Sequence, residues 1–125
     1  MRSPKQIIAS IGLVGLMTTL AVGGLTGTAS ADACPSGATC AYTTTNWGGA
    51  PGPVYGNNTD LRSFAKWTGA ESIYNNGTQC NVYVYSSTSY GGTRYPLNKG
   101  TGWKTISGSA IWHHAWSNKW FGTGC

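Results

Sequence analysis

The sequence predicts an all-β protein, a Greek-key sandwich built from two copies of one folding unit. Three observations predict this fold class. An octapeptide pattern occurs twice, short alternating segments rich in β-forming residues are separated by dense turn signals, and no stretch after residue 31 has the 3.6-residue apolar period of a helix. Short strands divided by such turns pack as a two-sheet sandwich or a barrel.

The repeated pattern is YTTTNWGG at 42–49 and YSSTSYGG at 85–92, a spacing of 43 residues. In each copy the first aromatic residue leads a strand, the small polar residues form a turn, and the second aromatic residue folds back over that turn. A glycine supplies the positive φ that such a bend requires. We therefore expect two hairpin units, at about 39–79 and about 80–125.

Four strands are expected along the chain, at Thr39–Tyr42, Ser72–Asn75, Asn81–Tyr85 and Ala110–His113. The second and fourth of these echo each other as SIYN and AIWH, so each is expected to end a unit. Their spacing of 38 is five less than that of the octapeptides, which predicts about five extra residues in the first unit's connection. A single helical turn is expected there, at 60–64.

The first 31 residues have the pattern of a secretory signal peptide. Arg2 and Lys5 precede an apolar stretch at 7–22, and an Ala-Ser-Ala cleavage site follows at 29–31. The polar residues and glycines within the apolar stretch make it a poor membrane span. Cleavage after Ala31 would leave residues 32–125, which is the length of one small domain.

Four cysteines lie in this expected mature part, an even number that predicts two disulfides in an exported chain. They are Cys34, Cys40, Cys80 and Cys125, and three pairings are possible. The local pair Cys34–Cys40 is favoured because the intervening Pro-Ser-Gly can turn the chain back on itself. Cys80–Cys125 would then tie the last residue to the middle of the chain.

The charged residues exclude several functions. Residues 32–125 hold six basic residues, each isolated, against three acidic ones, so we expect no nucleic-acid surface. Asp60 and Glu71 are the only acidic side chains after Asp32, so we expect no catalytic carboxylate pair and no enzyme. His113 and His114 would point to opposite faces of a strand, so we expect no metal site and no cofactor.

The chain has a high aromatic content, with fifteen Trp, Tyr and Phe residues. Most are expected to fill the core, because Leu, Ile and Val are scarce. The alternative is that some form a binding face, since exposed Trp and Tyr residues anchor interfaces and sugar rings. The best candidates for such a face are the four large rings within ten residues, Trp112, Trp116, Trp120 and Phe121.

The doubled hairpin, with Ser72-Ile73 after the first copy and Ala110-Ile111 after the second, resembles the paired Greek-key motifs of βγ-crystallin-like domains. The opening Cys34-Pro35-Ser36-Gly37 with Cys40-Ala41-Tyr42 resembles the secreted actinobacterial proteins of peptidase inhibitor family I36. Calcium-binding crystallin domains carry acidic or amide residues ahead of a serine pair. The matching segments here, 67–72 and 105–110, lack those leading carboxylates, so no calcium site is expected.

The resemblance implies a secreted, monomeric inhibitor of extracellular proteases, metalloproteases in particular, that lodges a surface loop in the protease cleft. The loop at 51–55, with Val54 or Tyr55 entering a hydrophobic pocket, and the connection from Ser72 to Cys80 are the candidate inhibitory segments. The alternatives are an antifungal or toxin-like protein that binds chitin or another wall polysaccharide through its aromatic residues, and a structural extracellular module without a small partner.

Overall fold

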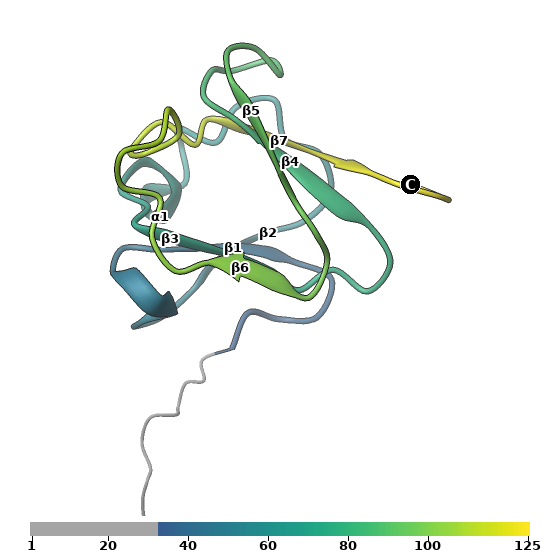
Figure 1. Ribbon diagram of the computed structural model, residues 1–125, viewed down its shortest axis with the longest axis horizontal. Helices are drawn as coiled ribbons and strands as arrows, with labels where there is room; N and C mark the ends of the chain where they lie inside the picture. The colour runs from purple at the N-terminus through teal and green to yellow at the C-terminus, as the bar shows by residue number, and fades with distance from the viewer. Residues whose placement is uncertain (1–32) are drawn as a thin grey trace, which may run out of the picture. The chain divides into compact units, whose positions relative to one another are not determined.

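Seven short strands form two antiparallel sheets in the computed structural model, which describes residues 33–125. The predicted signal peptide lies outside the described residues. The elements in chain order are β1 (Thr39–Tyr42), η3 (Thr45–Trp47), β2 (Gly52–Val54), α1 (Ala65–Thr68), β3 (Ser72–Asn75), β4 (Asn81–Tyr85), β5 (Arg94–Leu97), β6 (Thr101–Trp103) and β7 (Ser117–Phe121). Figure 1 shows the sheets as two layers.

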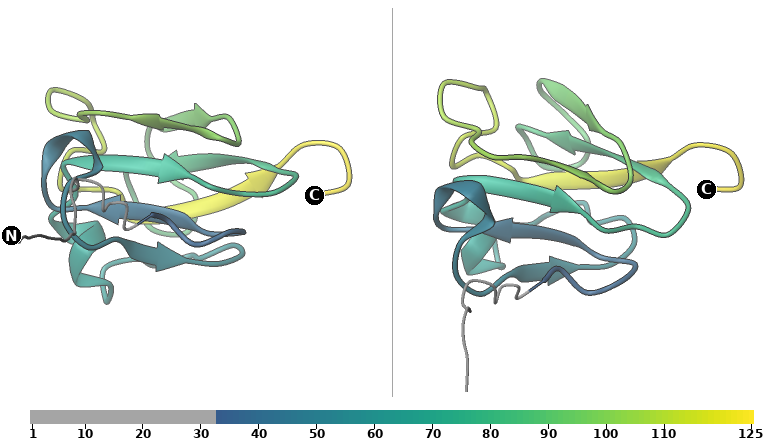
Figure 2. Two further views of the ribbon diagram at one scale, coloured as in Figure 1. Left: turned by 90° about the horizontal axis from the view of Figure 1, so that it is seen from below. Right: turned by 60° about the horizontal axis from the view of Figure 1, so that its bottom comes forward.

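The two sheets exchange segments between the halves of the chain. The first sheet has the order β2-β1-β3-β6 and the second has the order β5-β4-β7. Strand β6 follows β5 along the chain but joins the first sheet beside β3, and the four strands of this sheet lie side by side in Figure 2. Conversely, Asn58 from the first half of the chain forms an isolated antiparallel β-bridge with Asn118 on β7 of the second sheet. The halves are therefore interlocked as Greek keys.

The predicted repeat is confirmed at the level of backbone geometry. Asn46 and Trp47 have φ of 56° and 55°, and Ser89 and Tyr90, 43 positions later, have φ of 55° and 61°. The final glycines of both copies, Gly49 and Gly92, also have positive φ. The bend differs from the expectation in one respect, because the two residues before the glycines also have the left-handed conformation.

A serine fastens each bend to its sheet in the same way. Ser72 Oγ accepts a hydrogen bond from Trp47 N at 3.0 Å and donates one to Thr44 O at 2.7 Å. Ser117 Oγ accepts from Tyr90 N at 3.1 Å and donates to Ser87 O at 2.6 Å. Ser117 is thus the structural counterpart of Ser72.

The strand predicted at 110–113 is wrong, and the unit ends instead in β7. Residues 110–113 form turns, with His113 at φ 58°, and Ile111 reaches the core from that turn with 1% of its surface exposed. The apparent echo arose because an isoleucine is buried in both segments for different reasons. Since Ser117 rather than Ala110 matches Ser72, the second connection is the longer one, not the first. The helical turn expected at 60–64 also lies later, at α1.

The core lies between the sheets and follows the alternation of the strands. Val82 and Val84 of β4 point inward with Ile73 of β3, and Trp67 of α1 is completely buried beside them, donating its indole N–H to Gly52 O at 3.0 Å. A second cluster covers the outer face of the first sheet, and it consists of Cys34, Ala38, Cys40 and Tyr42 with Trp47 and Tyr74 packed against them.

The structure contains the two predicted disulfides in the favoured pairing. Cys34–Cys40 has a Cα–Cα distance of 5.7 Å and Cys80–Cys125 one of 6.0 Å. The first disulfide is part of the cluster over the first sheet. The second joins the residue directly before β4 to the segment after β7. Within residues 33–125 no helix has the length and apolar character needed to cross a bilayer.

Candidate functional site

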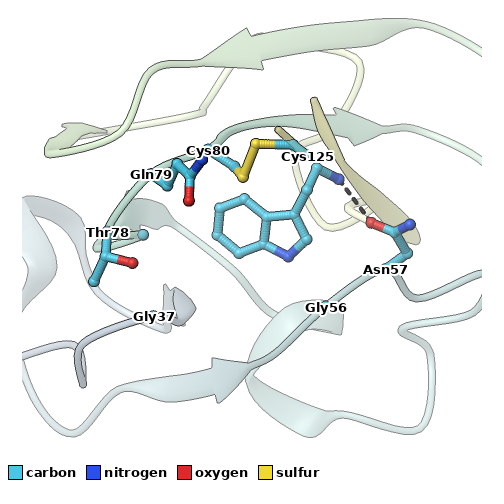
Figure 3. A pocket seen from close by; sticks show the side chains of 9 residues that line it. Gly37, Gly56, Asn57, Thr78, Gln79, Cys80 and Cys125 are labelled. Atoms are coloured by element: carbon cyan, nitrogen blue, oxygen red, sulfur yellow. Dashed lines mark hydrogen bonds between the residues drawn. A yellow bond between two sulfur atoms is a disulfide. The ribbon is translucent and has the colours of Figure 1, made fainter. Parts of the chain in front are cut away.

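A groove of about 400 Å³ lies beside the bend that follows β2. Its walls are the segment 77–80, between β3 and β4, and Gly56 with Asn57, and the Cys80–Cys125 disulfide is at one end. Figure 3 shows Thr78 and Gln79 across the groove from Asn57. The complete lining is Gly37, Gly56, Asn57, Gly77, Thr78, Gln79, Cys80, Trp120 and Cys125. It holds an indole, neutral polar groups and a disulfide, and no charged side chain.

Trp120 joins this groove to the core. Its ring is half-buried and packs against the central cluster, and its backbone N–H donates to Asn57 Oδ1 at 2.8 Å. A Cβ on Gly77 would lie 2.8 Å from the indole, so only glycine allows the chain to pass this close to the ring. The groove is consequently held by contacts between segments that are far apart in the sequence.

The bend that follows β2 carries the most exposed large hydrophobic side chain among the described residues, Tyr55, with 58% of its surface accessible. Gly56, the next residue, has φ of 67° and turns the chain toward the groove. We call residues 55–57 the Tyr55 bend. It places one exposed aromatic ring next to the groove that Gly56 and Asn57 line.

A network of amide side chains braces the Tyr55 bend. Asn58 Nδ2 donates to the carbonyl oxygens of Tyr55 and Gly56 at 3.2 and 3.3 Å, and to Asn118 Oδ1 at 3.0 Å. Asn118, which is fully buried, donates from Nδ2 to Gly56 O at 3.0 Å. The backbones of Asn58 and Asn118 exchange two further hydrogen bonds at 3.0 Å. The bend is therefore tied to β7 by several hydrogen bonds.

Of the two residues predicted to enter a protease pocket, only Tyr55 is accessible. Val54 is 3% exposed and belongs to the core, so the prediction that it could be presented to a partner is wrong. Pairing of β2 with β1 decides this, because Val54 is the last residue of β2 and is held over the core opposite Thr39, whereas Tyr55 follows the strand. The braces Asn58 and Asn118 were missed: the sequence marks the first only as part of a turn signal and carries no sign of the second.

The four aromatic residues predicted to form a binding face do not lie on one face. Trp112 is 41% exposed and stacks on His113, with ring centroids 4.3 Å apart, while Trp116 packs near His114. Trp120 lines the groove, and Phe121 stacks on Tyr83 at 3.9 Å on the opposite side of β7. Consecutive positions on a strand necessarily separate the last two.

Within residues 33–125 there are two acidic side chains, Asp60 and Glu71, and each is paired with a basic side chain rather than with the other carboxylate. The carboxylate of Asp60 accepts hydrogen bonds from the side chain and from the backbone N–H of Arg62, the shortest at 2.9 Å. These hydrogen bonds lower the pKa of Asp60 to about 2. The pKa of Glu71 is lowered as well, mainly by a hydrogen bond from the His113 side chain and to a smaller extent by one from the Trp112 indole. Both carboxyl groups are therefore ionised near neutral pH, whereas a general acid needs a raised pKa. Among residues 33–125 no group of three His, Cys, Asp or Glu side chains is placed to hold a metal ion.

Comparisons with known proteins agree with the two-sheet architecture. The model of peptidase inhibitor family I36 matches residues 27–95, more than half of the chain. A structure from work on the evolution of the eye-lens βγ-crystallin domain fold matches with a TM-score of 0.61 at 18% identity, covering 78% of this chain and 93% of that one. No curated protein sequence matches the chain.

Two further structures show the same similarity. IPSE alpha-1, an IgE-binding crystallin, matches with a TM-score of 0.57 at 24% identity over 73% of this chain and 87% of that one. The βγ-crystallin from Ciona intestinalis matches with a TM-score of 0.55 at 17% identity over 68% of this chain and all of the other. At these identities the similarity is one of fold. The chain has the all-β βγ-crystallin fold with two antiparallel sheets.

Proposed function

This chain belongs to peptidase inhibitor family I36, and on that premise we propose that it is a secreted inhibitor of extracellular metalloproteases. The family consists of peptidase inhibitors rather than enzymes, so a protease is the partner that membership implies. The choice of metalloproteases, secretion after removal of residues 1–31, action as a monomer and an actinobacterial host are parts of the proposal. The two disulfides support an oxidising location outside the cytoplasm.

We assign inhibition to the Tyr55 bend, and one observation carries this assignment. The bend combines the most exposed large apolar side chain of residues 33–125 with a backbone that is hydrogen-bonded to β7. Tyr55 is suited to a hydrophobic specificity pocket of a protease. A braced backbone loses little conformational entropy when it binds, which favours affinity. It also resists the distortion that cleavage of a bound loop requires.

The groove beside the bend gives the protease a second contact area. Thr78 and Gln79 are exposed on the far wall and carry neutral hydrogen-bonding groups. A protease that takes Tyr55 into its pocket would bring the rim of its cleft against this wall. The Cys80–Cys125 disulfide limits how far the wall can move. The contact surface in this proposal is thus rigid on both sides of the groove.

The test is an activity titration of a thermolysin-type metalloprotease and a subtilisin-type serine protease with the purified protein. We expect loss of the metalloprotease activity at a one-to-one molar ratio, with the inhibitor recovered uncut. Tyr55→Ala should weaken inhibition by at least about 30-fold, since truncation of an anchor residue costs about 2 kcal/mol or more. Phe64→Ala is the matched control, because Phe64 is an aromatic residue with 40% exposure outside the bend and the groove.

Three results would contradict the proposal in different places. No inhibition of either protease would remove the inhibitor function of this chain. Inhibition of the serine protease alone would correct the protease class. If Tyr55→Ala still inhibits the metalloprotease and Phe64→Ala does not, the inhibitory contact lies on another surface. Mass spectrometry of the secreted protein, starting at Asp32 or elsewhere, tests the signal peptide separately.

A further inference from the structure

The outer face of the second sheet has a chemistry that protease inhibition at the Tyr55 bend does not use. Strand β4 points Val82 and Val84 inward, so Tyr83 points outward, between Pro96 of β5 and Lys119 of β7 in the strand register. The outer face of the first sheet is covered by the cluster around Cys34–Cys40. The second sheet is instead the outermost layer on its side in Figure 1, and Arg94, Pro96 and Lys119 are exposed on it.

A stacked row crosses the three strands of this face. The guanidinium of Arg94 on β5 lies 4.2 Å from the centre of the Tyr83 ring on β4. Phe121 on β7 stacks on the same tyrosine with ring centroids 3.9 Å apart and an angle of 14° between the planes. A guanidinium packed on an aromatic ring in this way is held in one orientation, which leaves its planar fork of N–H groups ready for a carboxylate.

A second cation lies on the other side of β4. Lys119 Nζ is 5.2 Å from the centre of the Tyr90 ring, and Tyr90 in turn packs against Tyr85. Arg94 pairs with Tyr85 and Lys119 pairs with Tyr83, so two strand spacings across the sheet and two residues along β4 place their backbones roughly 12 Å apart. The face therefore presents two positive charges at a defined separation on an aromatic surface.

Neither cation is neutralised by the described part of the chain. The side chains of Arg94 and Lys119 form cation–π contacts, and no described acceptor hydrogen-bonds to them. The two described acidic residues are engaged elsewhere, Asp60 with Arg62 and Glu71 with His113. Because a ring contact leaves the charge of a cation in place, this face attracts an anionic partner.

The area of this face and its number of cations indicate which class of anionic partner it can bind. Three strands of four or five residues offer on the order of 250 Å², well below the roughly 800 Å² per partner of a stable protein interface. Two cations are also few for a nucleic acid, where six to ten phosphate contacts are usual for tight binding. A flexible polymer with separated charges and apolar ring surfaces needs neither a large area nor many cations.

We propose that the outer face of β5-β4-β7 binds an anionic polysaccharide whose sugar rings carry carboxylates. The Arg94 fork pairs with one carboxylate, Lys119 attracts a second one further along the chain, and Phe121 at the end of the row packs against a sugar ring. Such binding would hold the inhibitor near a cell surface or matrix while the Tyr55 bend, which contains none of these residues, acts on its protease.

The test uses the purified protein and polygalacturonate, with neutral dextran and single-stranded DNA as comparison polymers, in affinity electrophoresis at several salt concentrations. We expect retardation by polygalacturonate that weakens as salt rises, and none by dextran. Arg94→Ala should weaken the binding about tenfold, the loss of one hydrogen-bonded charge pair. Arg94→Lys keeps the charge but not the fork, and it should recover only part of that loss.

Lys104→Ala is the matched control, because it removes one exposed positive charge after β6, in the part of the chain that forms the first sheet. The proposal is overturned if polygalacturonate does not bind, if dextran binds equally well, or if Lys104→Ala weakens binding as much as Arg94→Ala. Tighter binding of DNA than of polygalacturonate would also overturn it. Arg94→Ala should retain protease inhibition, so failure here and failure of the inhibitor assignment are distinguishable. Circular dichroism and thermal melting confirm that each variant is folded.

Discussion

The brace beneath the Tyr55 bend provides the sharpest test of the inhibitory surface. In Asn118→Ala, two hydrogen bonds disappear, one from Nδ2 to Gly56 O and one from Asn58 Nδ2 to Oδ1, both 3.0 Å long. Each contributes about 1 kcal/mol, and the space left by the buried amide adds about 1 kcal/mol. We therefore expect the free energy of unfolding to fall by about 3 kcal/mol.

The same change should weaken inhibition through the entropy of the bend. The backbone pairing of Asn58 with residue 118 remains, but Gly56 loses its side-chain tether to β7. Ordering Tyr55 and Gly56 on binding then costs up to about 2 kcal/mol, which corresponds to an inhibition constant up to roughly 30-fold higher. Denaturant unfolding followed by tryptophan fluorescence measures the first effect, and a protease titration below the melting temperature measures the second.

Ser72→Ala provides the control for stability alone. Ser72 is also fully buried and also makes two side-chain hydrogen bonds, but it fastens the bend at Trp47 rather than the Tyr55 bend. We expect it to lose about 2 kcal/mol of stability and to inhibit as the unmodified protein does. If Asn118→Ala inhibits with unchanged affinity, or if Ser72→Ala weakens inhibition equally, rigidity of the Tyr55 bend is not what governs binding.

Three further predictions concern the groove, the long disulfide and the surface ion pair. Gly77→Ala places a Cβ 2.8 Å from the groove indole and should cost about 1 to 3 kcal/mol on unfolding, with altered tryptophan fluorescence; an unchanged midpoint would contradict the packing. Replacing Cys80 and Cys125 by serine should cost about 4 kcal/mol, measured by thermal melting, and a loss below about 1 kcal/mol would show that the closed loop contributes little. The carboxyl of Asp60 should titrate by NMR near its pKa of about 2, and Arg62→Gln should return it toward 3.8. Because the folded pKa is lowered, any stabilisation is complete above 3.8 and is lost as the pH falls through about 2, whereas a carboxyl that titrates near 3.8 before the substitution would refute the ion pair.

The repeated octapeptide correctly predicted two equivalent bends, because a bend depends on residues that are close together in the sequence. A bend with left-handed backbone at Asn46 and Trp47 needs small polar residues and glycine in a short order, and the same order at 85–92 produces the same bend. The expected strands Thr39–Tyr42, Ser72–Asn75 and Asn81–Tyr85 were likewise readable from alternation, and each occurs with the expected bounds.

The strand that ends the second unit could not be predicted from local sequence patterns. Ile111 looked like a strand residue, yet it is buried from a turn, whereas Ser117 is recognisable as the partner of Ser72 only through its hydrogen bonds to Ser87 and Tyr90. Burial and hydrogen bonding of this kind depend on residues 27 or more positions away, so no local pattern contains them.

The amino-acid sequence by itself determined the class of fold and the twin bends, and it favoured the local Cys34–Cys40 pairing, since turn chemistry and strand alternation act over a few residues. Tertiary structure alone decided which residues form the functional surfaces. Pairing of β2 with β1 buries Val54 and leaves Tyr55 outside, the contact of Asn58 with Asn118 across 60 positions braces the bend, and three strands bring Arg94, Tyr83 and Phe121 into one row. The physical reason is that exposure, rigidity and charge separation are properties of packed neighbours, which the chain acquires only when distant segments meet.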